Sequence, residues 1–305
     1  MQRAFIVGCP RSGTTLVQAM LARHPDVFSL QETRIFEALL GGVPARWGDR
    51  GARAGRRWYH RAGLAQAWGR ARLRELEQAY GTGRPRRPEP VRWTACVRRY
   101  VALLDHAAEA AGKSHWVEKT PNHLLFLDEI NARIPDARFV HVLRDGADVI
   151  ASLTDADLHQ QTTAFAGGVA QWTRRWNHAM QLHRAHMDDP RHLLLCLEDL
   201  VADPAGEWER LRRFLQLEEA VPLPASAGSA VADAQAEPWK RDAIAGIVDR
   251  PARKRQALLG PATLEWLDQH LDDYEAIKAA LHDDHSASVQ VQAGAPQRAG
   301  GAARC

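Results

Sequence analysis

Residues 8–15 read Gly8-Cys9-Pro10-Arg11-Ser12-Gly13-Thr14-Thr15 and stand between two apolar segments. The run before them, 4–8, predicts a buried parallel strand, and the apolar spacing at 15–22 predicts a helix. Two glycines with four residues between them, followed by hydroxyl side chains, are typical of a loop whose backbone N–H groups bind phosphate at a helix N-terminus. The stretch therefore predicts an α/β fold with an anion site directly after its first strand.

This loop lacks one residue of the common nucleotide-binding pattern. Thr14 occupies the position of the lysine that kinases and ATPases place between the β- and γ-phosphates, beside a magnesium ion. Without that charge, the loop favours a nucleotide whose single 5′-phosphate carries a neighbouring anionic group. A nucleotide kinase or NTPase of related fold and a tight turn without a ligand are the alternatives.

A second anion site is predicted after the apolar run 138–143. Arg144 follows this run, at the sheet edge where α/β proteins bind ligands, and Ser152 lies about two turns into the next helix. A phosphate between them would be held by a guanidinium and a hydroxyl. A surface arginine paired with Asp145 or Asp148 is the simpler alternative.

Short apolar runs alternate with helical patterns along the chain. Strands are expected at 27–30, 115–119, 138–143 and 193–197, and helices at 64–80, 97–111, 122–131, 147–154 and 204–215. The alternation predicts a single three-layer α/β domain with a parallel sheet over residues 1–284. Residues 285–305 are rich in Ser, Ala, Gln and Gly and predict a disordered tail.

Residues 41–99 contain 15 arginines, no lysine and four acidic residues. We expect this segment to be a helical insertion on the scaffold rather than part of the core. Its positive charge would steer an anionic acceptor, such as an acidic peptide or an anionic sugar, toward the site. An ordinary solvated arginine surface is the alternative.

The overall composition excludes several classes of protein. The chain has 305 residues, 45% hydrophobic and 25% charged, and its net charge of +3 is too small to indicate nucleic acid. No secretory signal or spanning segment is recognised, so we expect a cytoplasmic protein without a membrane partner. The isolated cysteines and the spacing of His178, His183 and His186 do not form a metal site, and these residues predict surface or packing roles.

The loop and the second anion site together resemble the sulfotransferases that use 3′-phosphoadenosine 5′-phosphosulfate (PAPS). Residues 10–16 are similar to their 5′-phosphosulfate loop, and residues 139–152 are similar to their 3′-phosphate motif, an arginine followed eight residues later by a serine. The resemblance implies a P-loop-kinase-like sulfotransferase fold, PAPS as donor, adenosine 3′,5′-bisphosphate (PAP) as product, and no metal. It also implies that the donor is bound by Arg11, Ser12, Gly13, Thr14, Thr15, Arg144 and Ser152.

Residues 24–34 resemble the tyrosylprotein branch of this family, in a bacterial type without a membrane anchor. In Gln31-Glu32-Thr33-Arg34 the resemblance makes Glu32 the general base and Arg34 the contact for an acidic acceptor. Gln31 departs from the branch, which often has another glutamate there. Glu118-Lys119-Thr120-Pro121 implies that Lys119, with Arg11, stabilises the leaving phosphate.

A basic cluster in the C-terminal part of the chain adds two residues to the resemblance. The family has a cationic loop over the 3′-phosphate, and Lys254 and Arg255, which precede Gly260-Pro261, are assigned to it. A solvated helix face explains these two residues equally well.

The resemblance thus implies an enzyme that moves a sulfuryl group from PAPS to an acceptor hydroxyl. A tyrosine in an acidic peptide or protein is the favoured acceptor, and a carbohydrate or a small molecule is the alternative. A non-catalytic module that keeps the nucleotide site is a further hypothesis. We allow for a homodimer and expect no nucleic acid as partner.

Overall fold

The computed structural model describes residues 1–52, 62–81, 88–159, 166–218 and 252–281. The chain forms two compact units, Met1–Asp272 and Asp273–Cys305, and all strands and site residues lie in the first. The tail predicted at 285–305 lies outside the described residues. Within the described ranges, no helix combines the length and the apolar composition needed to cross a membrane.

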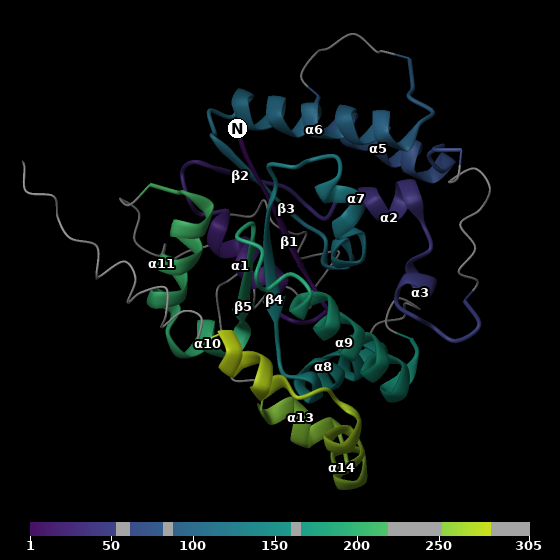
Figure 1. Cartoon of the computed structure of the whole chain (residues 1–305), viewed down its shortest axis with the longest axis vertical. Coiled ribbons are helices and arrows are strands. Elements are labelled where there is room, and N and C mark those ends of the chain that lie inside the picture. The colour runs from purple at the N-terminus through teal and green to yellow at the C-terminus, as the bar shows by residue number, and fades with distance from the viewer. Residues whose placement is uncertain (53–61, 82–87, 160–165, 219–251, 282–305) are drawn as a thin grey trace, which may run out of the picture. The chain divides into compact units, whose positions relative to one another are not determined.

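A five-stranded parallel sheet forms the centre of the first unit, in the order β2-β3-β1-β4-β5 (Figure 1). The strands are β1 (Gln2–Gly8), β2 (Val27–Ser29), β3 (His115–Lys119), β4 (Arg138–Leu143) and β5 (His192–Cys196). All five expected strands are confirmed. Because every strand runs in the same direction, their carboxyl ends meet at one edge of the sheet, where ligands bind in open α/β sheets.

Helices cover both faces of the sheet, which confirms the three-layer architecture. Along β1, Ile6 packs into the cluster made with α1 (Thr14–Leu21) and α11 (Pro204–Leu215). The neighbouring Phe5 points to the opposite face and meets Phe36 and His123. That face is covered by α6 (Trp93–Ala110) and α9 (Gly168–Arg184), which Figure 1 labels, and by the 3-10 helix η1 (Pro121–Phe126), which contacts β1. The alternation follows from the two-residue period of a strand.

The other helices are α2 (Ile35–Leu40), α3 (Val43–Arg46), α5 (Ala67–Tyr80), α7 (Leu127–Asn131), α8 (Gly146–His159), α10 (Leu197–Ala202), α13 (Ala252–Leu258) and α14 (Pro261–His270). The single helix expected at 122–131 is divided into η1 and α7. The helix expected at 97–111 begins four residues earlier, at Trp93.

The expectation that the Arg-rich segment 41–99 lies outside the core is wrong for α5. Leu73 and Leu76 of this helix are 1% and 4% exposed. Gly69 lies so close to α2 that a Cβ there would be 2.5 Å from the Cα of Leu39. The arginines of α5 therefore extend from a packed helix. Residues 53–61 and 82–87 of the segment lie outside the described residues.

Four histidines cluster between β4, α9 and β5. His141 is hydrogen-bonded through Nδ1 to His183 Nδ1 and through Nε2 to His192 Nδ1, each at 2.8 Å, and the ring of His186 lies 4.7 Å from that of His192. Burial and the neighbouring imidazoles hold the pKa of His141 well below its ordinary value. The same causes lower the pKa of His183 to about 3 and that of His192 to about 4. The packing role predicted for His183 is confirmed. Across the described ranges, no group of three or more His, Cys, Asp or Glu side chains is arranged to hold a metal ion.

We predict that this cluster makes the fold sensitive to mild acid. Below about pH 6.5 the unfolded chain binds protons that the folded histidines exclude, so the free energy of unfolding falls as pH falls. At pH 5 each histidine that stays neutral costs about 2 kcal/mol. Urea unfolding at pH 7.5 and pH 5.0 measures the difference, and equal midpoints at the two pH values would contradict the prediction.

Candidate functional site

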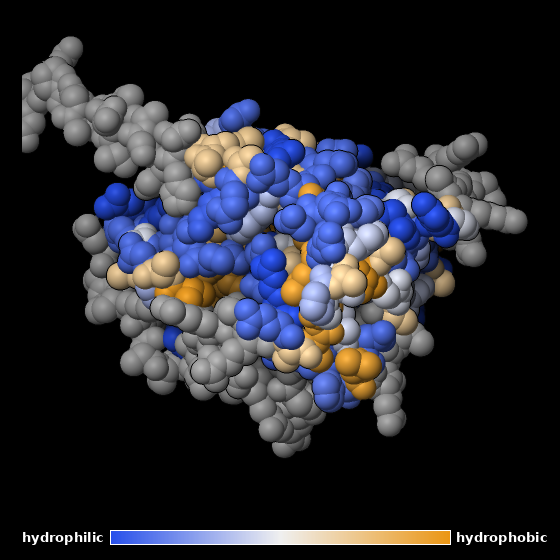
Figure 2. Space-filling model, turned by 90° about the horizontal axis from the view of Figure 1, so that it is seen from below, coloured by the Kyte–Doolittle hydropathy of each residue, from blue (hydrophilic) through white to orange (hydrophobic). Residues whose placement is uncertain are grey.

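The strand order places the predicted site residues in one row along the carboxyl edge of the sheet. Ile6 of β1 pairs with Lys119 at the end of β3. Arg144 follows β4 on the other side of β1, and Glu32 follows β2 beyond β3. The loop 8–15 therefore lies between Lys119 and Arg144. Figure 2 views the molecule from the side toward which β1 runs in Figure 1, and hydrophilic residues cover much of the described surface there, around smaller hydrophobic patches.

Close contacts fix the conformation of the loop after β1. A Cβ at Gly8 would lie 2.6 Å from the carbonyl oxygen of Val142. Gly13 has a φ of +96°, and a Cβ there would lie 2.8 Å from the side chain of Leu197. Arg11 also has a positive φ of 73°, which is uncommon for a residue other than glycine. The two glycines are required because β4 and α10 leave no room for a side chain and because position 13 is left-handed.

The loop offers hydrogen-bond donors that suit a phosphate. The hydroxyl of Ser12 is buried and has no hydrogen-bond partner among the described residues. Thr14 and Thr15 begin α1, so their N–H groups have no carbonyl partner within the helix. A buried hydroxyl without a partner is costly, and a phosphate oxygen would accept its hydrogen bond. The loop thus fits the phosphosulfate end of the donor implied by the resemblance.

The predicted second anion site adjoins this loop. Arg11 Nε donates a hydrogen bond to Ser152 Oγ at 3.1 Å, and Arg144 Nη1 donates to the Arg11 carbonyl at 3.1 Å. Trp176 of α9 donates to the Arg144 carbonyl at 3.0 Å and so fixes the backbone of that arginine. The structure therefore brings Arg11, Arg144 and Ser152 together. Two guanidinium groups beside a hydroxyl form a positive patch that complements a phosphate.

The two C-terminal cations contact carboxylates in and next to α8. Lys254 Nζ lies 2.6 Å from Asp155 Oδ2, and Arg255 Nη1 lies 3.5 Å from Asp145 Oδ1. Although burial opposes ionisation of Asp155, the hydrogen bond and charge of Lys254 hold the pKa of that carboxyl below its ordinary value. The structure places both cations beside the helix that carries Ser152, in ion pairs with acidic residues.

The predicted base and the predicted leaving-group cation are in direct contact. Glu32 Oε1 forms an ion pair with Lys119 Nζ, and its other oxygen lies 3.5 Å from Arg34 Nη2. The exposed fractions of the Lys119, Glu32 and Arg34 side chains are 1%, 16% and 59%. The carboxylate therefore stands between a buried cation and an exposed one, where it can accept a proton from a hydroxyl that arrives from solvent.

A buried polar network that the sequence analysis missed supports this carboxylate. Glu118 of β3 accepts hydrogen bonds from Thr33 N at 3.1 Å, Thr33 Oγ1 at 2.9 Å and Thr120 Oγ1 at 2.6 Å. His123 Nδ1 lies 2.9 Å from its second oxygen. Burial alone would raise the pKa of Glu118, but His123 and the hydrogen bonds hold it below the ordinary value. A glutamate inside a strand needs partners when it is buried, and that was the signal available in the sequence.

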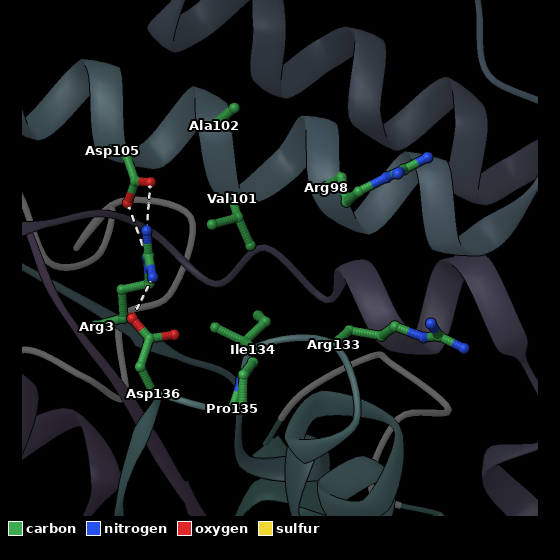
Figure 3. A pocket seen from close by; sticks show the side chains of 9 residues that line it. All are labelled: Arg3, Arg98, Val101, Ala102, Asp105, Arg133, Ile134, Pro135 and Asp136. Atoms are coloured by element: carbon green, nitrogen blue, oxygen red, sulfur yellow. Dashed lines mark hydrogen bonds and ion pairs between the residues drawn. The ribbon is translucent and has the colours of Figure 1, made fainter.

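A cavity of about 280 Å³ lies away from the candidate site (Figure 3). It is lined by Arg3, near the amino end of β1, whereas the site residues stand at the carboxyl ends of the strands. Arg3 is paired with Asp105 at 2.8 Å and with Asp136. The cavity is therefore separate from the site, and the charge of Arg3 is already met by two carboxylates.

We predict that Glu118→Gln destabilises the protein by about 3 kcal/mol, because an amide cannot accept all the hydrogen bonds that the buried carboxylate accepts. Since the folded pKa of Glu118 is lowered, its contribution is present at neutral pH and is lost as pH falls through that folded pKa. Urea unfolding at pH 7.5 tests this, with the exposed Glu109→Gln on α6 as control. Equal stability of the two variants would contradict the prediction.

Comparisons with known proteins agree with these observations. A family model described as "Sulfotransferase family" matches residues 3–220. The chain is 26% identical over 222 residues to a protein-tyrosine sulfotransferase of Drosophila melanogaster, and the aligned region covers 71% of this chain and 38% of the relative. It is 31% identical over 153 residues to nodulation protein NoeE of Sinorhizobium fredii, and this aligned region covers 49% of this chain and 30% of the relative. The chain spans about half the length, or less, of several of the curated relatives it matches, these two among them.

Solved structures show the same architecture. The sulfotransferase domain of the Synechococcus PCC 7002 olefin synthase is 19% identical, with a TM-score of 0.56, over 90% of this chain and 95% of that domain. The sulfotransferase domain from the curacin biosynthetic pathway is 18% identical, with a TM-score of 0.54, over 85% and 92%. The expected α/β sulfotransferase fold is confirmed.

Proposed function

The chain belongs to the sulfotransferase family, and on this premise we propose that it transfers the sulfuryl group of PAPS to an acceptor hydroxyl and releases PAP. The observation that carries the proposal is the contact between Glu32 and the buried Lys119, one strand away from a phosphate-type loop. PAPS supplies an activated sulfuryl group, whose transfer requires a base for the acceptor and a cation for the leaving phosphate.

The donor would be held at both phosphorylated ends. The Ser12 hydroxyl and the N–H groups of Thr14 and Thr15 face the 5′ end in this proposal, and Arg144 and Ser152 hold the 3′-phosphate. Arg11 connects the 5′ and 3′ binding sites. Its backbone carbonyl accepts a hydrogen bond from Arg144, and its side chain donates one to Ser152.

The order of the strands supports the assignment of the catalytic groups. Because β3 lies between β2 and β1, Lys119 stands between Glu32 and the phosphate loop. Glu32 removes the proton of the attacking hydroxyl, and Lys119 donates a hydrogen bond to the oxygen of the departing phosphate. An ammonium group has three donors, so Lys119 can orient Glu32 and contact that oxygen at the same time.

We favour a tyrosine of an acidic peptide or protein as the acceptor. Gln31-Glu32-Thr33-Arg34 resembles the corresponding run of the tyrosylprotein branch, and matched relatives are named protein-tyrosine sulfotransferases. Arg34 is exposed beside Glu32, where it would attract an acidic residue next to the acceptor tyrosine. A carbohydrate or small-molecule hydroxyl is the other outcome of the acceptor test.

For the donor, we predict that Arg144→Lys lowers the affinity for PAP about 10- to 100-fold and leaves the affinity for 5′-AMP unchanged, because lysine cannot form the forked contact with a 3′-phosphate. Shifts of the melting temperature measure the binding of both ligands. PAP at 100 times its dissociation constant raises the free energy of unfolding of the wild type by about 2.7 kcal/mol. Stronger stabilisation by ATP with magnesium than by PAP would instead support a nucleotide kinase or NTPase.

For the acceptor, we predict that the wild type labels an acidic tyrosine peptide from labelled PAPS in preference to oligosaccharides. Glu32→Gln should lower this transfer about 10²- to 10⁴-fold, since it removes the general base, and should still bind PAP. Label on sugar alone would contradict the tyrosine acceptor. Full transfer by Glu32→Gln would contradict the assignment of the base.

A further inference from the structure

An arginine of the Arg-rich segment 41–99 forms hydrogen bonds to the main chain at Glu32. Arg72 of α5 donates from Nε to the Thr33 carbonyl at 2.8 Å and from Nη2 to the Glu32 carbonyl at 3.0 Å. Its Nη1 donates to Glu75 Oε2 at 2.9 Å, one turn further along the helix. One planar guanidinium therefore binds two consecutive carbonyl groups, and all three of its nitrogens donate to oxygens of the protein.

The N–H groups of the same turn are bound from the opposite side. Thr33 N donates to Glu118, and Arg34 N donates to Thr120 Oγ1 at 3.1 Å. Arg34 has a φ of 51°, in the left-handed region that residues other than glycine rarely adopt. Such a conformation persists where its surroundings over-determine it. Here β3 and its following residue bind the two N–H groups, and α5 binds the two carbonyls.

This arrangement also fixes the direction of the Glu32 side chain. The Thr33 hydroxyl points inward, to Glu118 and to Tyr100 OH at 3.3 Å. Glu32, the residue before it, reaches Lys119 instead. A rotation of the Glu32–Thr33 peptide groups would therefore carry the carboxylate away from the lysine.

We propose that Arg72 is a positioning residue for sulfuryl transfer, which acts by holding the Glu32–Thr33 carbonyls so that the Glu32 carboxylate faces Lys119 and the acceptor hydroxyl. The inference rests on the proposed function, in which Glu32 is the base. Misplacement of a catalytic group by about 1 Å can cost 10²-fold in rate, so a remote clamp on its backbone has a measurable effect. This role differs from the steering of an anionic acceptor that the sequence predicts for the Arg-rich segment. The side chain of Arg34 is about twice as exposed as that of Arg72, so Arg34 is the better placed of the two to contact an acceptor.

The test compares Arg72→Gln and Arg72→Lys with a matched control on the same helix. Arg74 lies two residues away and pairs with Glu89 at 2.9 Å on the surface. We expect Arg72→Gln to lower kcat at least about tenfold, with PAP affinity and acceptor KM unchanged. Arg72→Lys should recover only part of kcat, because an ammonium cannot match the fork. Arg74→Gln should behave as the wild type.

Two kinetic results would overturn the proposal. The first is a raised KM for the acidic tyrosine peptide with kcat unchanged, which would make Arg72 an acceptor contact. The second is a kcat of Arg72→Gln equal to that of the wild type.

Crystal structures of the wild type and Arg72→Gln test the positioning without reference to activity. We expect the Glu32–Lys119 contact in the wild type and its loss in the variant, and an unchanged contact would overturn the proposal. If the wild type transfers no sulfuryl group but the variant still displaces Glu32, the proposed function fails while the positioning by Arg72 stands.

Discussion

The site depends on the burial of Lys119 at the carboxyl end of β3. A buried ammonium group is strongly destabilising unless an opposite charge meets it, and the Lys119 side chain is 1% exposed. Glu32, which follows the neighbouring strand β2, supplies that charge. The pair can form because β2 and β3 are adjacent and parallel, so the residues that follow them meet at one edge. The need to neutralise one buried cation thus brings a carboxylate within reach of the phosphate loop.

Along this edge of the sheet, the groups proposed to act on the acceptor and the groups proposed to bind the donor follow different strands. Glu32 follows β2 and Lys119 ends β3, whereas Arg144 follows β4. The phosphate loop after β1 lies between Lys119 and Arg144. Packing holds each part: Leu197 of α10 lies against Gly13, and Trp176 of α9 binds the carbonyl of Arg144. Helices distant in sequence from the loop and from Arg144 therefore fix the backbone that presents the donor-binding groups.

The sequence predicts the parts of this molecule that depend on neighbouring residues. Apolar runs locate all five strands, and the spacing of Gly8 and Gly13 locates the phosphate loop. Contacts between distant residues could not be predicted in this way. Arg72 reaches Thr33 across 39 positions, and Glu118 reaches it across 85. The burial of α5 is hidden by its arginines, and the only local signal for it is the spacing of Leu73 and Leu76, three residues apart on one helical face.

A crystal structure of the protein with PAP tests the account most directly. The account predicts the 5′-phosphate against the Ser12 hydroxyl and the first N–H groups of α1, with Lys119 nearby, and the 3′-phosphate within hydrogen-bond distance of Arg144 and Ser152. A nucleotide bound away from the carboxyl edge of the sheet, with Arg144 turned from its 3′-phosphate, would contradict it.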